Sequence, residues 1–144
     1  MKNFLFVFAG LCFAQAICGQ TNTTLSLLTH TVWEHGKPAY GDYRQMVYTD
    51  STIKIWCKDE NDRMASDSCR WYYLTDREEM SFDVAKMGKR KDGNYYMMLD
   101  YYGNFTCFKI LEIGKERLKV VAIRVNGKEK TPGIPWTYTP LRKR

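Results

Sequence analysis

Few side chains in this 144-residue sequence could do chemistry, and none of them stands in a catalytic pattern. The two histidines, His30 and His35, are five residues apart, across the expected start of a strand and a loop, which is a poor spacing for joint metal binding. Cys107 with either histidine would supply a thiol and an imidazole, but no local signature of a nucleophilic cysteine surrounds it. We therefore expect a protein that is not an enzyme and needs no cofactor or metal ion.

Charged segments give no stronger indication. The acidic run 59–62 resembles the start of a calcium loop but lacks the glycine at position six and the glutamate at position twelve, so we interpret it as a solvated hairpin tip. The formal net charge is +6, with denser basic spots at 86–91 and 142–144. In an exported protein a solvated turn and a terminal tail explain these spots, and we expect no nucleic-acid partner.

The first nineteen residues are typical of an export signal. Lys2 supplies the positive start, residues 4–13 form an apolar run too short to span a bilayer, and small residues follow. Cleavage after Ala16 and cleavage after Gly19 both fit, and we take 1–19 as the signal peptide and 20–144 as the mature domain. The expected location is the periplasm or cell envelope of a Gram-negative bacterium. The membrane is a partner only if Cys18 is lipidated.

Three cysteines remain in the mature domain, and an oxidising compartment permits disulfides. Cys57 and Cys69 stand at the two edges of a polar segment with strand-like sequence outside each. A hairpin would bring them face to face, so we predict a Cys57–Cys69 disulfide, with two reduced thiols as the alternative. Cys107 is then a free, buried, small apolar residue.

Short runs rich in Tyr, Phe, Trp, Val, Ile and Thr recur along the chain, separated by turn residues. No segment has a helical apolar period over ten or more residues, and the best helical candidate is 22–28. The expected turns are 50–51, 102–104 and Asn126-Gly127, the last a strong hairpin signal. The expected strands are 31–34, 43–49, 52–57, 69–74, 79–86, 95–101, 105–113, 117–125 and 135–141.

The lengths of the connections favour a barrel over a sandwich. Successive turns of a meander fall at alternate ends, which would gather the long segments 35–42, 58–68 and 87–94 at one end, opposite the short ones. We therefore expect one all-β domain, an antiparallel up-and-down meander closed into a barrel of roughly eight strands. Three prolines, at 132, 135 and 140, predict that the last segment is not a central strand.

Alternation of apolar and polar residues predicts which side chains point into the barrel. Ile53 and Ile55 alternate with Lys54, so the isoleucine face is the buried one. A disulfide from Cys57 would put Cys69 on that same face, and apolar residues follow it at period two. Such an interior is either a filled core or a pocket for one small ligand. The expected interior, and thus the expected ligand-binding set, is Ile55, Trp71, Tyr73, Phe82, Met97 and Leu99.

At this point the chain resembles the exported lipocalin-like (calycin-type) domains of Gram-negative bacteria. Lipocalins carry Gly-x-Trp on the first strand, and the matching residues are Thr31, Val32 and Trp33, with Thr31 in the place of the glycine. The family packs an arginine from a late strand across that tryptophan. Arg142 is the expected equivalent, and Arg124 the alternative. The resemblance implies a lipocalin-like barrel that binds small apolar molecules.

Two functions from different classes follow. The first is a monomeric envelope protein that binds a small hydrophobic molecule in its barrel. The alternative is a protein–protein interaction module, an inhibitor or accessory subunit, with a filled barrel and an exposed aromatic patch built from Trp56, Tyr72 and Tyr96.

Overall fold

A computed structural model describes residues 23–36, 43–58, 61, 63–131 and 133–141. The predicted signal peptide 1–19, Cys18 and Arg142 lie outside these residues. The described part contains the helix α1 (Thr24–Thr29) and a short 3₁₀ helix (Val84–Lys86). Its strands are β1 (Val32–His35), β2 (Arg44–Tyr48), β3 (Thr52–Lys58), β4 (Met64–Thr75), β5 (Tyr95–Leu99), β6 (Phe105–Ile113), β7 (Leu118–Val125), β8 (Lys128–Glu129) and β9 (Trp136–Pro140).

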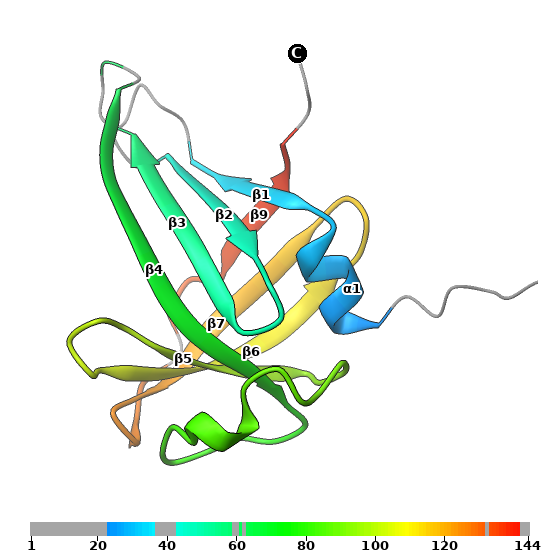
Figure 1. Ribbon diagram of the computed structural model, residues 1–144, viewed down its shortest axis with the longest axis vertical. Coiled ribbons are helices and arrows are strands. Elements are labelled where there is room, and N and C mark those ends of the chain that lie inside the picture. The colour runs from blue at the N-terminus through cyan, green and yellow to red at the C-terminus, as the bar shows by residue number, and fades with distance from the viewer. Residues whose placement is uncertain (1–22, 37–42, 59–60, 62, 132, 142–144) are drawn as a thin grey trace, which may run out of the picture.

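The strands form one antiparallel sheet that closes on itself (Figure 1). Consecutive strands from β1 to β7 pair with each other, and β9 lies between β7 and β1. Eight strands thus complete the ring and β8 is an addition to it. The predicted all-β, up-and-down eight-stranded barrel is confirmed, and residues 64–70 of β4 extend beyond β5 and pair only with β3.

Two segments, β8 and β9, pair with β7 on the side away from β6. β8 pairs with the end of β7 (Arg124 opposite Glu129), whereas β9 pairs with the start of the same strand (Val120 opposite Trp136). The prediction that prolines exclude the last segment from a central strand is wrong, because β9 is paired on both sides. Pro135 precedes β9 and Pro140 is its last residue, so neither removes a donor from the middle of the strand.

The segment predicted as a strand at 79–86 is not one. Residues 76–94 form a single connection from β4 to β5, here called the strap, which contains the 3₁₀ helix. Met80, Phe82 and Val84 alternate with polar residues in the sequence, but they do not form one buried face. Met80 and Val84 are 60% and 64% exposed. The predicted sorting of long and short connections is therefore also wrong. With no strand at 79–86, the long connection 76–94 lies at the same end as the short turn 50–51, and the short connection 100–104 lies at the other end.

The expected turns are present. Asn126 and Gly127 have φ values of 51° and 76°, which is the backbone of a two-residue hairpin turn between β7 and β8. The backbone N–H of Thr49 donates to the carbonyl of Thr52 at 2.8 Å and closes the β2–β3 turn. These turns set the register of the strands that form the barrel wall.

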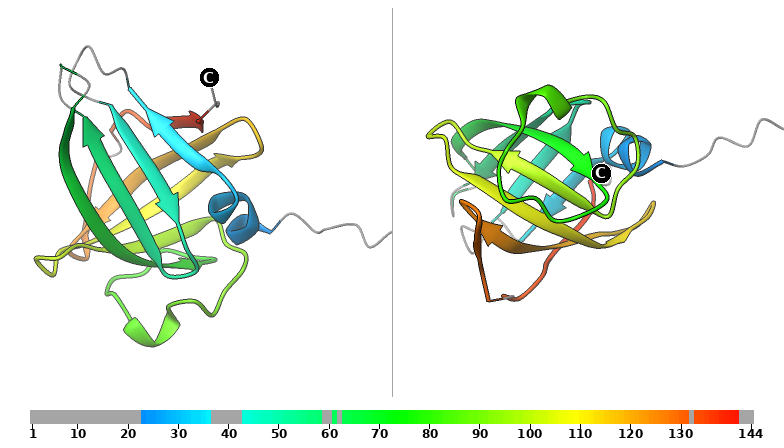
Figure 2. Two further views of the ribbon diagram at one scale, coloured as in Figure 1. Left: turned by 45° about the horizontal axis from the view of Figure 1, so that its top comes forward. Right: turned by 90° about the horizontal axis from the view of Figure 1, so that it is seen from below.

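The helix α1 closes one end of the barrel. Thr23 caps it, accepting a hydrogen bond from the backbone N–H of Ser26 at 3.1 Å, and Leu28 is fully buried. Trp33, at the start of β1, is also fully buried, and its Nε1 donates to the carbonyl of Leu28 at 3.3 Å. Figure 2 shows α1 beside the ends of the strands, where the chain enters β1. We call this the closed end.

Candidate functional site

The sheet buries apolar side chains on both of its faces. The interior cluster lies inside the barrel and includes Leu28, Trp33, Met46, Tyr48, Ile53, Tyr72, Leu74, Tyr96, Ile110, Leu118, Val120 and Tyr138. The outer cluster lies on the opposite face of β4, β5 and β6 and is centred on Tyr73, Met97 and Cys107. Residues directly opposite in paired strands share a face, so these two clusters fix which side chains point inward.

Aromatic rings occupy much of the interior. Tyr72 meets Tyr48 and Tyr96 edge to face, with centroids 5.4 and 6.1 Å apart, and Tyr96 stacks on Phe108 at 4.8 Å. Such contacts stabilise beyond the burial of apolar area alone. The barrel is therefore partly filled, and this packing limits the space left for a ligand.

A cavity of about 240 Å³ remains between these rings and the other end of the barrel. Its apolar wall includes Met46, Ile53, Ile55, Met98 and Phe108, which come from four different strands. Val125, Lys130 and Trp136 also line it, and all three are exposed, so the cavity reaches solvent where β7 ends and β9 begins. We call this the open end. A larger hollow of about 610 Å³ adjoins the cavity and shares Arg44 and Ile55 with it.

Tyr48 lines the cavity and carries a buried hydroxyl without a hydrogen-bond partner among the described residues. The residue is 2% exposed. Burial raises the pKa of Tyr48 well above its usual value, as does the proximity of Tyr96 and Tyr138. The Tyr96 side chain also has a polar interaction with the Tyr48 hydroxyl, but this contact does not meet hydrogen-bond geometry. The hydroxyl is thus neutral at physiological pH and can both donate and accept. A buried hydroxyl without a partner carries a free-energy cost of about 1–3 kcal/mol, which a ligand atom bonded to it would remove.

A cationic and aromatic group surrounds the open end. The Arg44 guanidinium lies over the Trp136 ring at 4.3 Å from its centroid. The His35 ring lies 5.4 Å from Trp136 and 5.3 Å from Tyr138, and its Nδ1 is 2.7 Å from the carbonyl of Thr137. Burial raises the pKa of Tyr138 to about 12, although the nearby Arg44 opposes this rise. These contacts hold the side chains of the rim in defined positions.

Of the six residues predicted to bind a ligand, only Ile55 lines the cavity. Tyr73, Phe82 and Met97 belong to the outer cluster, so their predicted inward orientation is wrong. Trp71 is 37% exposed and pairs with Leu99, on that same outer face. In β4 and β5 the inward residues are the neighbours in sequence, Tyr72, Leu74, Tyr96 and Met98. The structure therefore does not bring the predicted set together.

The predicted disulfide is the source of the register error in β4, which assigned Trp71 and Tyr73 to the wrong face. Cys57 lies opposite Ser66 and Cys69 lies opposite Lys54, which places the two cysteines on different faces and three residue positions apart. Three positions along a strand are roughly 10 Å, beyond the reach of a disulfide. Both thiols are free in the structure, and so is Cys107, which is fully buried as predicted. The predicted Cys57–Cys69 bond is therefore wrong.

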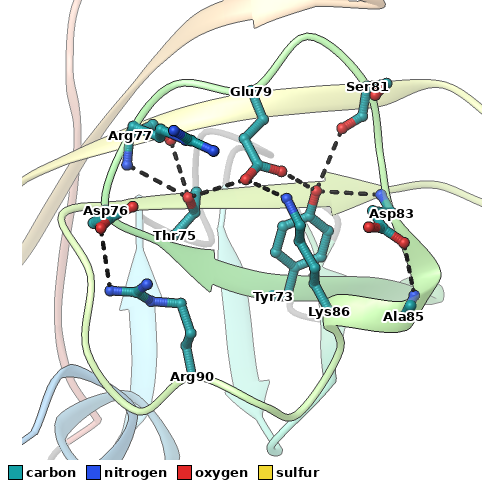
Figure 3. A network of polar contacts seen from close by, with 10 residues as sticks. All are labelled: Tyr73, Thr75, Asp76, Arg77, Glu79, Ser81, Asp83, Ala85, Lys86 and Arg90. Carbon is teal, nitrogen blue, oxygen red and sulfur yellow. Dashed lines mark hydrogen bonds and ion pairs between the residues drawn. The ribbon is translucent and has the colours of Figure 1, made fainter.

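The strap covers the outer cluster and is attached by a polar network (Figure 3). Phe82 packs on Tyr73 with ring centroids 4.9 Å apart. The carboxylate of Glu79 lies 2.6 Å from the Tyr73 hydroxyl, 3.3 Å from the Thr75 hydroxyl and 2.6 Å from Lys86 Nζ. Burial raises the pKa of the Cys107 thiol beneath the strap, so this cysteine is protonated and unreactive. The strap has a structural role on the face away from the cavity.

The arginine expected from the lipocalin resemblance is not found on Trp33 in the described residues. Arg124 faces outward, where its Nε donates to Glu78 at 3.0 Å, so it is not the equivalent. Arg142 is not described, and its predicted role stays a prediction. The interaction partner of Trp33 is instead the backbone of α1.

The predicted exposed aromatic patch is also absent. Tyr72 and Tyr96 are 0% and 3% exposed, because they point into the barrel, and Trp56 is only half-buried beside Lys54. The exposed aromatic pair of the described chain is instead Tyr101 and Tyr102, in the β5–β6 turn, at 79% and 84% exposure.

The described residues contain no cluster of three or more side chains suited to hold a metal ion. The His30 imidazole lies 2.8 Å from the carbonyl of Ser26 in its own helix turn, and His35 is fixed in the rim, so neither faces Cys107. In the part of the chain that the structure describes, no helix is long and apolar enough to cross a membrane.

The site residues that sequence reasoning missed are Arg44, Met46, Tyr48 and Trp136. The first three lie on one face of β2, because Arg44, Met46 and Tyr48 alternate with Gln45 and Val47. Both sets are partly apolar, so alternation alone does not decide which faces inward. Trp136 lies in the last segment, which we did not expect to be a central strand because of its prolines.

Compared with known proteins, the chain matches no family model, and no curated protein and no solved structure is significantly similar to it. The barrel and its cavity therefore stand as the basis for a functional proposal.

Proposed function

We propose that this protein binds one small, mostly apolar molecule in the cavity of its barrel, as lipocalin-like proteins do. The unpartnered Tyr48 hydroxyl, buried in the cavity wall, is the observation that carries the proposal. Buried polar groups in native proteins are almost always hydrogen-bonded, so a ligand atom that reaches Tyr48 Oη would complete a bond that the described residues do not supply.

The dimensions of the cavity restrict the ligand. Its volume of about 240 Å³ is below the roughly 300–1,000 Å³ of sites for drug-sized molecules. A compact body of one or two rings fits this space, whereas a long extended chain does not. Apolar contact with Met46, Met98 and Phe108 would provide most of the binding free energy, and one polar atom would meet Tyr48 Oη.

The direct test is calorimetric titration with naphthalene-2-methanol, a neutral two-ring probe. Ala122 lines the cavity, and Ala122→Phe would fill it, so we expect binding to be lost while thermal stability is kept. Ala85→Phe is the matched control, because Ala85 is exposed on the strap, and binding should be unchanged. Equal binding by wild type and Ala122→Phe would place the probe elsewhere and contradict the proposal.

Export to a bacterial cell envelope is part of the same proposal and rests on the leader 1–19. N-terminal sequencing of the protein recovered from the periplasm of its own cells is the test. A mature chain beginning near residue 17 or 20 is expected, and an intact Met1 in that fraction would contradict it.

A protein–protein interaction module is the second candidate. The exposed pair Tyr101 and Tyr102, beside Trp71 at the edge of the larger hollow, is the observation that favours it. Under this alternative, Tyr101→Ser combined with Tyr102→Ser would abolish capture of an envelope protein and Ala122→Phe would not.

A further inference from the structure

The charged side chains around the cavity indicate the chemical class of its ligand. This inference rests on the proposed function. Among the described residues, those that line the cavity include two cationic side chains, Arg44 and Lys130, and no aspartate or glutamate. The adjoining hollow adds Arg70, and its described lining residues likewise include no carboxylate. An apolar cavity whose entrance bears charge of one sign attracts ligands of the opposite sign.

Arg44 is positioned to meet such a ligand. It is half-buried, forms no ion pair with any residue that the structure describes, and is held over Trp136 at 4.3 Å. In register it lies opposite His35 on one side and Cys57 on the other, so its two cross-strand partners supply no negative charge. Stacking on the indole restricts the guanidinium without using its N–H donors, which leaves them available to a ligand.

Three carboxylates among the described residues near this end of the barrel have other partners or face outward. Glu34 alternates with the inward-facing Trp33 and accepts a hydrogen bond from the Tyr43 hydroxyl at 2.9 Å. Glu129 lies opposite the outward-facing Arg124. Asp100 accepts from the backbone N–H groups of Tyr102 and Asn104 and lies close enough to interact with Arg70. Arg70 is therefore partly compensated, whereas Arg44 and Lys130 form no ion pair with the residues that the structure describes.

We propose that the ligand is a small organic anion, a compact apolar ring system carrying one carboxylate-type group. The ring system lies between Met46, Met98 and Phe108, and the anionic group lies at the open end against Arg44 and Lys130. A guanidinium binds a carboxylate through two parallel N–H donors, and such charge-assisted bonds are roughly twice as strong as neutral ones. The remaining polar contact is the Tyr48 hydroxyl, deeper in the cavity.

A series of three probes with one ring system separates charge from shape. We would titrate the full mature domain at low salt with 2-naphthoate, 2-naphthamide and 2-naphthylmethylammonium. We expect the anion to bind about tenfold or more tightly than the neutral amide and the cation to bind most weakly. The preference should shrink in about 0.5 M salt, because screening weakens exposed ion pairs.

Variants assign the preference to named residues. Arg44→Met and Lys130→Met should each reduce the affinity for 2-naphthoate by a larger factor than the affinity for 2-naphthamide, and Arg44→Lys should restore part of the difference. Lys128→Met is the matched control, since Lys128 is exposed on β8 and does not line the cavity.

Binding of the amide without any anion preference would overturn this inference alone. An anion preference that survives Arg44→Met with Lys130→Met would also overturn it. Failure of all three probes to bind would overturn the proposed function as well.

Discussion

Two buried tyrosines on opposite faces of the sheet show how differently a hydroxyl can be accommodated. Tyr73 is 1% exposed, and its Oη lies 2.6 Å from a Glu79 carboxylate oxygen while accepting from the backbone N–H of Asp83 at 3.2 Å. Tyr48 is 2% exposed and its hydroxyl has no partner in the described structure. The first hydroxyl attaches the strap, whereas the second contributes no hydrogen bond within the described structure.

Removing these hydroxyls should therefore have different effects on stability. Tyr73→Phe leaves Glu79 and the Asp83 N–H short of a partner, and we expect the free energy of unfolding to fall by about 1–2 kcal/mol. Tyr48→Phe removes an unpartnered polar group, and we expect no loss or a gain of up to about 1 kcal/mol. Urea denaturation of the ligand-free protein measures both. A loss of stability in Tyr48→Phe equal to that in Tyr73→Phe would contradict this assignment.

Glu79 should make the stability dependent on pH. Burial alone would raise the pKa of its carboxyl, but hydrogen bonds from Lys86, Tyr73 and Thr75 outweigh burial and hold the pKa below its usual value of 4.5. A carboxyl with a lower pKa in the folded state stabilises that state above the unfolded pKa, and this contribution is lost as pH falls through the folded pKa. We expect stability to fall from about pH 5 downward.

Glu79→Gln should remove this part of the pH dependence, and denaturation between about pH 3 and 7 measures it. The control is Glu112→Gln, because Glu112 is exposed and its ion pair with Arg117 at 3.5 Å is a surface pair of little energetic value. If Glu79→Gln and wild type lose stability in parallel on acidification, the strap network does not contribute as described.

At the scale of the elements, the strap is a connection that behaves as part of the core. Gly93, near its end, runs so close to β4 that a Cβ there would lie 2.3 Å from the backbone oxygen of Thr75. Neither the backbone of β4 nor that of the strap can move aside cheaply. The strap therefore requires glycine at this position for reasons of space.

We expect Gly93→Ala to lower the free energy of unfolding by about 1–3 kcal/mol through overpacking. Gly133→Ala is the control, because a Cβ at Gly133 meets nothing within 4 Å. Thermal denaturation of the two variants provides the comparison. Equal stability would show that the strap does not pack against β4 in solution as it does in the structure.

The strands were predictable from the sequence, but the faces of two of them were not. Eight of the nine predicted runs contain strands of the structure, because β-branched and aromatic runs between turn residues are a local signal. The face of β4 depends on register against β3, which is a non-local property. A one-residue error moves every side chain to the opposite face, and the assumed Cys57–Cys69 bond introduced that error.

The outer cluster explains why alternation could not correct the error. In β4 and β5 both faces are apolar, since Tyr72 and Leu74 pack inside while Tyr73 and Met97 are buried under the strap. Sequence patterning identifies a buried face only where the other face meets water. A connection that buries the outer face of a barrel removes that contrast, and only the three-dimensional arrangement restores it.

For the molecule as a whole, the central claim is that the binding site lies inside the barrel and not on its outer face. The neighbouring residues Met97 and Met98 distinguish these alternatives. Met98 lines the cavity together with Met46, whereas Met97 is fully buried in the outer cluster beside Met87. A ring system in the cavity would shift the methyl resonances of the first pair only.

The most direct measurement is a methyl NMR titration of methionine-labelled protein with naphthalene-2-methanol. If the ligand binds inside the barrel, saturable shifts are expected at Met46 and Met98, with Met97 and Met87 unchanged. Shifts at Met97 and Met87 with Met46 and Met98 unmoved, or no shift at any of the four, would contradict binding inside the barrel.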